Sequence, residues 1–495
     1  MRILIFLIFS INILCGQNPP VFNWANSIGI NGSSNGRDIK TDSLGNRYVF
    51  GFFSGTSDFD FGPGIINRAA AGFSGLFLSK YNPSGNLVWL NIIDGSGQDW
   101  ANQGLAITKS GDIFISGHFN NTVDFDPGPG VNNLTSNGQG DIFMAKYTSN
   151  GVFVWVKQVG GTGNDYCINL RLDTNEDIYI TGGFETAVDF DPGPGINNLF
   201  SIGSTDIYLA KYNGSSGALI WANGFGSIGL EDGHSVEPDT LGNVFFAGFF
   251  KGSVDFDPGP GSFILTANVG SEDIFFGKYN AVNGNLIWAK SVGASMDDRA
   301  NSIDWDASNS IVVAGYFRGT VDFDPGPATA VLTSTTGSVE GFFAKYDANG
   351  DYIFAKQLNA GYFNYVTRDK DSKIYLTGIF SNGITYSDFD PGPGTFSLSL
   401  SGTGNTDAFI AKYTSNGAII NAVGLGGNTL GGNGVSVSVQ KNGKIDASGN
   451  FTGTGDFDPG PPVYVLNGIN TSAYCAQFDS LLNFIQAGNV YGENS

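Results

Sequence analysis

The stretch Asp124-Phe125-Asp126-Pro127-Gly128-Pro129-Gly130 decides the fold of this 495-residue chain, because close copies of it occur seven times. Neighbouring copies start 65 to 68 residues apart, and fourteen of the 18 prolines lie within them. The copies begin at Asp58, Asp124, Asp189, Asp255, Asp322, Asp388 and Asp456. A period this even predicts a repeat architecture and leaves no room for a second domain.

Each repeat contains four runs that read as β-strands. A short alternating run comes first, and an aromatic run such as Val244–Phe250 precedes the Asp-Phe-Asp string. A third run such as Asp141–Tyr147 follows the string. The fourth run carries tryptophan in four repeats, at Trp89, Trp155, Trp221 and Trp288. Such runs, rich in β-branched and aromatic residues and bounded by Gly, Asn and Asp turns, predict antiparallel strands joined by hairpins.

Four antiparallel strands in each repeat of about 66 residues predict an all-β fold, a single seven-bladed β-propeller. Stacking blades around an axis buries the large aromatic side chains between them and leaves only short exposed edges. A linear β-solenoid is the alternative, but its coils are usually far shorter than these repeats. We name the strands of each blade A to D from the axis outward.

The N-terminus has the pattern of a secretory signal peptide. A basic start at Arg2 precedes the apolar run Ile3–Leu14, and the small residues Cys15 and Gly16 follow. This run is too short to span a bilayer, and no other run approaches that length. Residues 1–16 are therefore expected to be removed, leaving 17–495 as an exported propeller, secreted or at the cell surface. Lipidation at Cys15 is the alternative, but Leu14 stands where such signals need a small residue.

Two segments compete for the outer strand of the closing blade. Val21–Asn26 resembles the fourth-strand segment Leu219–Asn223, and the chain also ends with Leu482–Ile485. We expect the N-terminal copy to supply the strand, because it keeps the tryptophan that the C-terminal copy lacks. The two thiols outside the signal, Cys167 and Cys475, are expected to be buried and free.

The charge balance excludes several classes of function. The chain carries 24 Lys and Arg against 45 Asp and Glu, a formal net charge of −21. So acidic a surface repels phosphate backbones, which argues against nucleic-acid binding. With only two histidines, His118 and His234, a histidine-cluster metal site is excluded. The aromatic content of 14% argues against disorder.

The repeat resembles the SBBP-type bacterial β-propeller repeat. Shared features are the turn pattern D-x-x-G-N, as in Asp239–Asn243, an aromatic strand ending in Gly, an Asp-Phe loop, and D-x-F-x-x-K, as in Asp141–Lys146. The resemblance covers residues 22–489 and implies a propeller in a secreted or surface protein of unassigned activity. The Asp-Phe-Asp-Pro-Gly-Pro-Gly form is similar to exported Bacteroidetes proteins, which often end in a sorting domain. No such domain is visible here, which leaves the route of attachment open.

The strand order predicts two faces of different charge. Loops from D to A and from B to C share one face, so every Asp-Phe-Asp string is expected there. The D-to-A loops are expected to add Asp99, Asp165, Asp232, Asp297 and Asp298 to this acidic face. The opposite face is expected to carry the lysines that end the third strands, Lys80, Lys146, Lys211, Lys278, Lys345 and Lys412.

The Asp-Phe-Asp strings have two interpretations. In the structural one, the Phe fills a gap between blades and the carboxylates cap turn N–H groups. In the other, the alternating carboxylates and loop carbonyls supply part of the six to eight oxygens that Ca²⁺ takes. No cofactor is required by either. The candidate calcium ligands are Asp58, Asp60, Asp124, Asp126, Asp189, Asp191, Asp255, Asp257, Asp322, Asp324, Asp388, Asp390, Asp456 and Asp458.

A ligand site is expected where the repeats differ. The D-to-A loops carry a set of unlike residues at roughly corresponding places, a set that suits a sugar or peptide. These are Trp100, Tyr166, His234, Arg299 and Tyr362. The preferred hypothesis is a monomeric binding or adhesion scaffold for a glycan or protein. The alternative is an exported carbohydrate-active hydrolase or lyase with axial carboxylates, for which Asp304 and Asp306 beside Trp305 are the nearest candidates. No residue is assigned a catalytic role.

Overall fold

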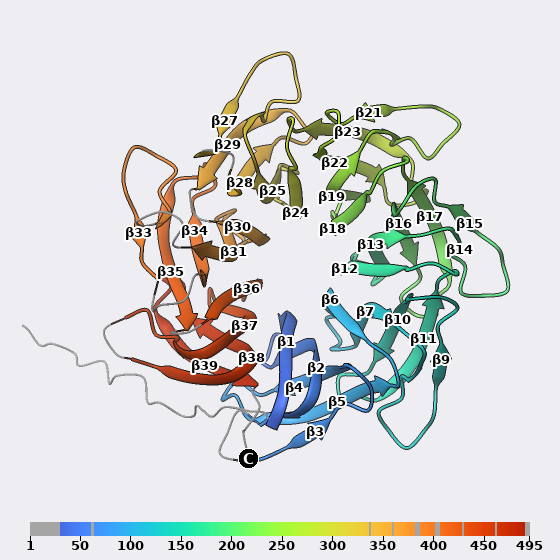
Figure 1. Ribbon diagram of the computed structural model, residues 1–495, viewed down its shortest axis with the longest axis vertical. Helices are drawn as coiled ribbons and strands as arrows, with labels where there is room; N and C mark the ends of the chain where they lie inside the picture. The colour runs from blue at the N-terminus through green and yellow to red at the C-terminus, as the bar shows by residue number, and fades with distance from the viewer. Residues whose placement is uncertain are drawn as a thin grey trace, which may run out of the picture.

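The computed structural model describes residues 30–490 except 61–63, 336–337, 359–360, 382–386, 401–405, 428–429 and 461–462. The described residues are all-β, without an α-helix, and form a propeller-like arrangement of antiparallel sheets around a central axis (Figure 1). Within these ranges no helix is long and apolar enough to cross a membrane. The predicted signal peptide, residues 1–16, and the segment Val21–Asn26 lie outside the described residues.

Sets of four strands paired in the order A, B, C, D recur along the chain, either as a separate sheet, as in β18-β19-β22-β23, or within a larger one. Each set is called a blade below. The A strands are β1 (Ile30–Thr41), β6 (Trp100–Ile107), β12 (Tyr166–Leu172), β18 (Asp232–Pro238), β24 (Arg299–Trp305), β30 (Tyr362–Arg368) and β36 (Leu430–Val439). The B strands are β2 (Arg47–Asp58), β7 (Ile113–Phe119), β13 (Ile178–Phe184), β19 (Asn243–Lys251), β25 (Ile311–Phe317), β31 (Ile374–Ser381) and β37 (Ile445–Asp456).

The outer half of each blade is made by the third and fourth strands. The C strands are β4 (Gly75–Tyr81), β10 (Asp141–Tyr147), β16 (Asp206–Tyr212), β22 (Glu272–Asn280), β28 (Glu340–Tyr346), β34 (Thr406–Tyr413) and β38 (Val465–Phe478). The D strands are β5 (Leu87–Gly95), β11 (Phe153–Val159), β17 (Leu219–Phe225), β23 (Leu286–Val292), β29 (Tyr352–Leu358), β35 (Ile419–Gly427) and β39 (Phe484–Val490).

The Asp-Phe-Asp strings lie in hairpins at the outer circumference (Figure 1). The short strands are β3 (Asn67–Ala69), β8 (Thr122–Asp124), β9 (Asn133–Thr135), β14 (Ala187–Asp189), β15 (Asn198–Phe200), β20 (Ser253–Asp255), β21 (Ile264–Thr266), β26 (Thr320–Asp322), β27 (Val331–Thr333), β32 (Ser387–Asp388) and β33 (Ser397–Leu398). β8 pairs with β5, the outer strand of the preceding blade, and β37 pairs likewise with β35. The hairpins therefore tie neighbouring blades together.

The Phe of each string is a core residue, as the sequence predicts. All seven are fully buried. Phe256 lies 5.7 Å from the ring of Phe225 in the preceding blade, and 5.5 and 4.9 Å from Phe250 and Phe275 of its own blade. The Tyr279 hydroxyl donates a hydrogen bond to the Phe256 carbonyl at 3.0 Å. The same bond, at 2.8 to 3.1 Å, is made by Tyr81, Tyr147, Tyr212, Tyr346 and Tyr413.

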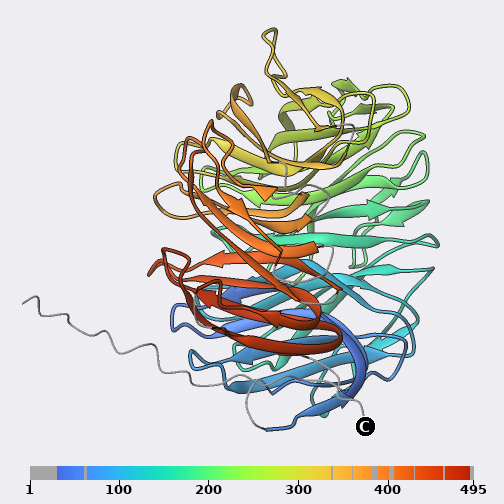
Figure 2. The same cartoon turned by 60° about the vertical axis from the view of Figure 1, so that its left-hand side comes forward.

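The first and last blades are in contact (Figure 2). The Arg47 guanidinium of β2 forms a buried ion pair with Asp446 of β37, with Nε 2.9 Å from Oδ1. The Asn450 amide donates to Asn35 Oδ1 at 2.6 Å. Cys475 of β38 packs in one buried cluster with side chains of β2 and β4.

The expected origin of the outermost strand in the last blade is wrong. β39 occupies the free edge of β38, with Gln486 opposite Gln477, and the N-terminal copy Val21–Asn26 lies outside the described residues. The turn before β39 is tight, because Asp479 Oδ1 accepts the N–H groups of both Leu481 and Asn483. A hairpin closes a short loop at low entropic cost, and this outweighs the missing tryptophan.

Both described cysteines are free and buried, as the composition predicts. Burial raises the pKa of Cys167 to about 11 and that of Cys475 to about 12. Both thiols therefore stay protonated and unreactive at neutral pH.

Candidate functional site: an axial cavity

A β-bulge or register shift in each innermost strand turns side chains toward the axis. An extra residue in one strand bends the chain locally and re-aims its side chain. In β6 the irregular stretch is longer and runs between Ala101 and Leu105, so that Asn102 and Gln103 share it. In the other A strands the bulged residues are Arg37, Ile168, His234, Asn301, Asn364 and Val435.

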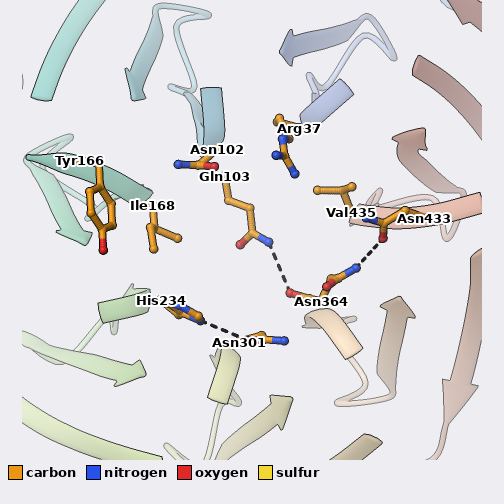
Figure 3. A pocket seen from close by; sticks show the side chains of 10 residues that line it. All are labelled: Arg37, Asn102, Gln103, Tyr166, Ile168, His234, Asn301, Asn364, Asn433 and Val435. Carbon is orange, nitrogen blue, oxygen red and sulfur yellow. Dashed lines mark hydrogen bonds between the residues drawn. The ribbon is translucent and has the colours of Figure 1, made fainter. Parts of the chain in front are cut away.

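These bulged residues line one cavity of about 320 Å³, together with Tyr166 and Asn433 (Figure 3). Gln103 reaches across it and donates to the Asn364 carbonyl at 3.4 Å, and the Asn364 amide donates to Asn433 Oδ1 at 2.7 Å. On the other side His234 Nδ1 lies 3.2 Å from Asn301 Oδ1. The polar lining residues are half-buried. The cavity is therefore walled mainly by amides that both donate and accept hydrogen bonds.

One blade differs from its neighbours beside this cavity. Asp232 opens β18 where Tyr166 and Arg299 open β12 and β24. The Tyr166 hydroxyl donates to Asp232 Oδ2 at 3.2 Å, and His234 Nε2 lies 3.5 Å from the same oxygen. Burial and then the Asp232 charge raise the pKa of Tyr166, so its phenol stays a hydrogen-bond donor. Asp232 Oδ1 is buried without a hydrogen-bond partner in the described part of the chain.

Two of the five predicted ligand residues, Tyr166 and His234, line the cavity. Trp100 packs on the ring of Phe52, with centroids 4.6 Å apart. Tyr362 packs beside Tyr316 at 6.2 Å. Arg299 is ion-paired with Glu272 at 2.6 Å and lies over Phe249. These last three are not among the cavity-lining residues.

The sequence reasoning missed most of the lining for a definite reason. Trp100, Tyr166, Arg299 and Tyr362 occupy the first position of their strands, whereas the bulged residue comes two positions later. A bulge adds one residue, so strict alternation no longer tells which side chains share a face. One feature of the sequence could have indicated the lining. Asn102, Asn301 and Asn364 all lie two residues after the first residue of their strands, so an asparagine recurs at the same place in three repeats.

Further along the same strands the axis is filled with paired charges. Arg171 Nε lies 2.5 Å from Glu237 Oε1, and its Nη2 donates to the Tyr365 hydroxyl at 2.7 Å. Lys40 Nζ lies 2.6 Å from Asp38 Oδ1. Burial raises the pKa of Glu237, against the opposing effect of Arg171. These axial carboxylates are thus engaged by cations of the chain itself.

The carboxylates of the Asp-Phe-Asp strings hold turns. Asp255 Oδ1 accepts the N–H groups of Asp257 at 3.0 Å and Phe263 at 2.7 Å. Burial tends to raise the pKa of Asp255, but these two hydrogen bonds outweigh it and the pKa is lowered. The first Asp of each other string accepts the corresponding pair of N–H groups. This geometry supports the structural interpretation of the strings.

The second Asp of the string lies close to the last residue of the string. A Cβ on Gly130 would lie 2.1 Å from Asp126 Oδ2, so a larger residue here would need this carboxylate to shift. Ala328 and Pro462 stand at the corresponding position of two other strings. Asp126 Oδ1 in turn accepts the Gly128 N–H at 2.8 Å. Among the described residues no group of three or more His, Cys, Asp or Glu side chains could hold a metal ion. Calcium binding by the strings stays a prediction.

The lysines that end the C strands lie over the A-to-B and C-to-D turns, the side that the strand order predicts. Lys211 Nζ lies 3.1 Å from Asp173 and 3.2 Å from Asp177 in one such turn. Lys80 Nζ donates to the Ser149 carbonyl of the next blade at 3.3 Å. The acidic turns there pair with the lysines, so the two faces differ less in charge than the sequence suggests.

Three of the D-to-A loop carboxylates, Asp99, Asp165 and Asp298, are fully buried and add no exposed charge to the predicted acidic face. Asp165 accepts the N–H groups of Gly161 at 2.7 Å and Glu185 at 2.9 Å, and so fixes its loop to the end of the B strand. Burial raises the pKa of Asp99 to about 8, of Asp165 to about 6 and of Asp298 to about 7.

The fold and site define a class, an all-β, repeat-like β-propeller with an axial cavity. No model of a known protein family matches the chain. The chain is 23% identical, over 92% of its length, to a protein of Acanthamoeba polyphaga mimivirus described as "Uncharacterized WD repeat-containing protein L264". It spans 37% of the length of that relative.

Three solved structures resemble the chain at low sequence identity. The Dos1 propeller has a TM-score of 0.38 at 10% identity, covering 87% of this chain and 94% of its own. A Bacteroides caccae protein of unknown function has a TM-score of 0.25 at 9% identity, covering 57% and 89%. Rhamnogalacturonan lyase YesW has a TM-score of 0.24 at 13% identity, covering 94% and 91%. All three scores are low, and nothing about function follows from them.

Proposed function

We propose that this protein is an exported binding scaffold, secreted or at the cell surface, that takes a glycan in the axial cavity of a closed seven-bladed propeller. The ring is supported by the sequence period of 65 to 68 residues and by the ion pair between Arg47 and Asp446 of the first and last blades. The repeat pattern similar to SBBP proteins and the signal-like N-terminus support export. No nucleic acid or membrane span is expected, and the chain is proposed to act as a monomer.

The observation that carries the function is the amide-rich lining of the cavity. Asn102, Gln103, Asn301, Asn364 and Asn433 all contribute to it. Amide side chains donate and accept hydrogen bonds, as sugar hydroxyls do, and the pairing of such groups fixes a ligand's orientation. The volume of about 320 Å³ is at the small end of ligand sites, which span about 300–1,000 Å³. It suits one or two sugar residues.

The enzymatic alternative is less well supported. Hydrolysis of a glycosidic bond usually needs two carboxyl groups flanking it, and the cavity lining contains neither Asp nor Glu among the described residues. Asp304 and Asp306 are ion-paired with Arg368 at 3.0 and 3.5 Å. Burial tends to raise the pKa of Asp306, but Ser308, Lys345 and Arg368 outweigh it and the pKa is lowered. An ionised, paired carboxylate is a poor general acid.

A glycan array probed with the purified mature chain tests the proposal, with His234→Ala as the cavity variant. His234 contacts Asn301 and Asp232, and its loss should weaken the glycan signal by at least about tenfold if it faces the ligand. Asn198→Ala, an exposed amide of the outer hairpin strand β15, is the matched control. Equal binding by all three proteins, or no glycan bound by any, would reject the axial glycan site. Thermal melts of each variant check the fold.

Calcium at the Asp-Phe-Asp strings is a separate proposal with its own test. A ligand that binds only the folded state stabilises it, so millimolar Ca²⁺ should raise the melting temperature and a chelator should lower it. Sodium chloride at matched ionic strength screens charge without bridging carboxylates and is the control. An equal rise in melting temperature with both salts would rule out specific calcium binding by the strings. The double variant Asp255→Asn/Asp257→Asn should remove about one-seventh of a specific effect, since one string of seven is changed.

A further inference from the structure

Arg37 is the exception among the arginines of the innermost strands. Arg171, Arg299 and Arg368 each form an ion pair with a carboxylate. Within the described ranges Arg37 has no ion pair, and its buried Nε has no hydrogen-bond partner. In a chain with 45 acidic residues against 24 Lys and Arg, an arginine without a carboxylate in a half-buried position requires an explanation.

The position of Arg37 supplies that explanation. It is the bulged residue of β1, so its side chain projects toward the middle of the axial cavity (Figure 3). Arg37 Cζ lies over the Phe52 ring, 5.3 Å from its centroid, and this contact supports the guanidinium without neutralising its charge. Burial lowers the pKa of Arg37, yet an arginine stays charged in a protein. A charge withdrawn from water gains most from an anion that completes its hydrogen bonds.

We propose that the axial cavity binds a saccharide that carries a carboxylate, such as a uronic acid, and that Arg37 is its anchor. The inference rests on the proposed glycan function and names the class of ligand. The guanidinium presents a planar fork of N–H donors that matches the two oxygens of a carboxylate. Gln103, Asn301 and Asn364 line the same cavity and provide partners for the hydroxyl groups of the sugar ring.

The single positive charge of Arg37 in the cavity favours a carboxylate over a phosphate as its ligand. One guanidinium balances the single charge of a carboxylate, whereas a phosphate monoester carries about two charges at neutral pH. The cavity lining offers no lysine or second arginine in the described residues. The net charge of −21 repels a polyanion at long range. A small monoanion with several hydroxyl groups is the ligand that satisfies both the lone cation and the ring of amides.

Isothermal titration calorimetry with matched sugars tests this inference. The purified chain is titrated with galacturonate and glucuronate, with galactose and glucose as their neutral partners, and with acetate as a bare carboxylate. At least one acid sugar should bind about 10- to 100-fold more tightly than its neutral partner, the range expected for hydrogen bonds to a charged group. Arg37→Gln should bring the acid sugar to the affinity of the neutral one.

Arg68→Gln makes the same change of charge at an exposed residue of β3 and should leave binding unchanged. Arg37→Lys keeps the positive charge without the planar pair of N–H donors. Its affinity for the acid sugar should lie between that of Arg37→Gln and that of the unchanged protein. Neutral sugars that bind as well as acid sugars would overturn the inference while leaving the glycan function intact. If acetate binds as tightly as the acid sugars, the carboxylate alone accounts for the affinity, and the inference that the ligand is a saccharide is overturned. Failure of every sugar would reject the proposed function itself.

Discussion

Removal of the Phe256 ring tests whether the Asp-Phe-Asp strings hold the blades together. The ring is fully buried and lies 5.7, 5.5 and 4.9 Å from the rings of Phe225, Phe250 and Phe275. Truncation of a buried phenylalanine to alanine costs about 3–5 kcal/mol, which includes the cavity left behind. Phe225 belongs to the preceding blade, so part of the loss falls on the contact between two blades. Phe256→Ala should therefore lower the unfolding free energy by about 3–5 kcal/mol.

Guanidinium chloride unfolding followed by tryptophan fluorescence measures this loss, and Trp221 lies in the same buried cluster as Phe256. Phe263→Ala is the matched control, because Phe263 is in the same hairpin but 41% exposed. Its loss should stay below about 1 kcal/mol. Hydrogen exchange should also rise in β17 and β19, on the two sides of the contact. Similar losses for the two variants would show that the buried ring does not join the blades.

Two further perturbations follow from buried carboxylates. Asp446→Ala leaves Arg47, its ion-pair partner at 2.9 Å, as an uncompensated buried charge. Guanidinium chloride unfolding should therefore show an unfolding free energy lower by about 3–5 kcal/mol. An unchanged unfolding free energy would contradict the contact between the first and last blades. Burial raises the pKa of Asp99 to about 8 in the folded protein, so its contribution to stability is complete below about pH 4 and is lost as the pH rises through 8. Asp99→Asn should therefore reduce the fall in melting temperature between pH 5 and 9. Asp165→Asn should reduce that fall less, because the pKa of Asp165 is raised only to about 6. A pH dependence of the melting temperature that neither variant changes would argue against these pKa shifts.

The sequence predicted the strands and the buried Phe well. The aromatic run Val244–Phe250 lies within β19, and Asp141–Tyr147 coincides with β10. Both predictions depend on local composition and on turns marked by Gly, Asn and Asp. The sequence does not predict the outer strand of the last blade correctly, because the tryptophan in Val21–Asn26 is a weaker determinant than the tight turn at Asp479 that leads into β39.

The candidate site was predicted only in part. Tyr166 and His234 were found because they differ from their counterparts in other repeats. Arg37 and Asn364 were missed, since the bulges that aim them inward add a residue that alternation cannot reveal. The burial of Asp99 was missed because its partner, the N–H group of Asn120 at 3.4 Å, comes from the residue that follows β7.

The sequence by itself determined the repeat, the four strands in each blade and the residues that fill the core. These follow from a period of 65 to 68 residues and from strand patterns that act within a few residues of one another. Only the tertiary structure decided which side chains meet at the axis. Residues 37, 103, 234 and 364 come from different blades, and their meeting in one cavity depends on ring geometry and on bulges. That arrangement places Arg37 among amides rather than beside a carboxylate, because side chains from different blades meet at a common centre.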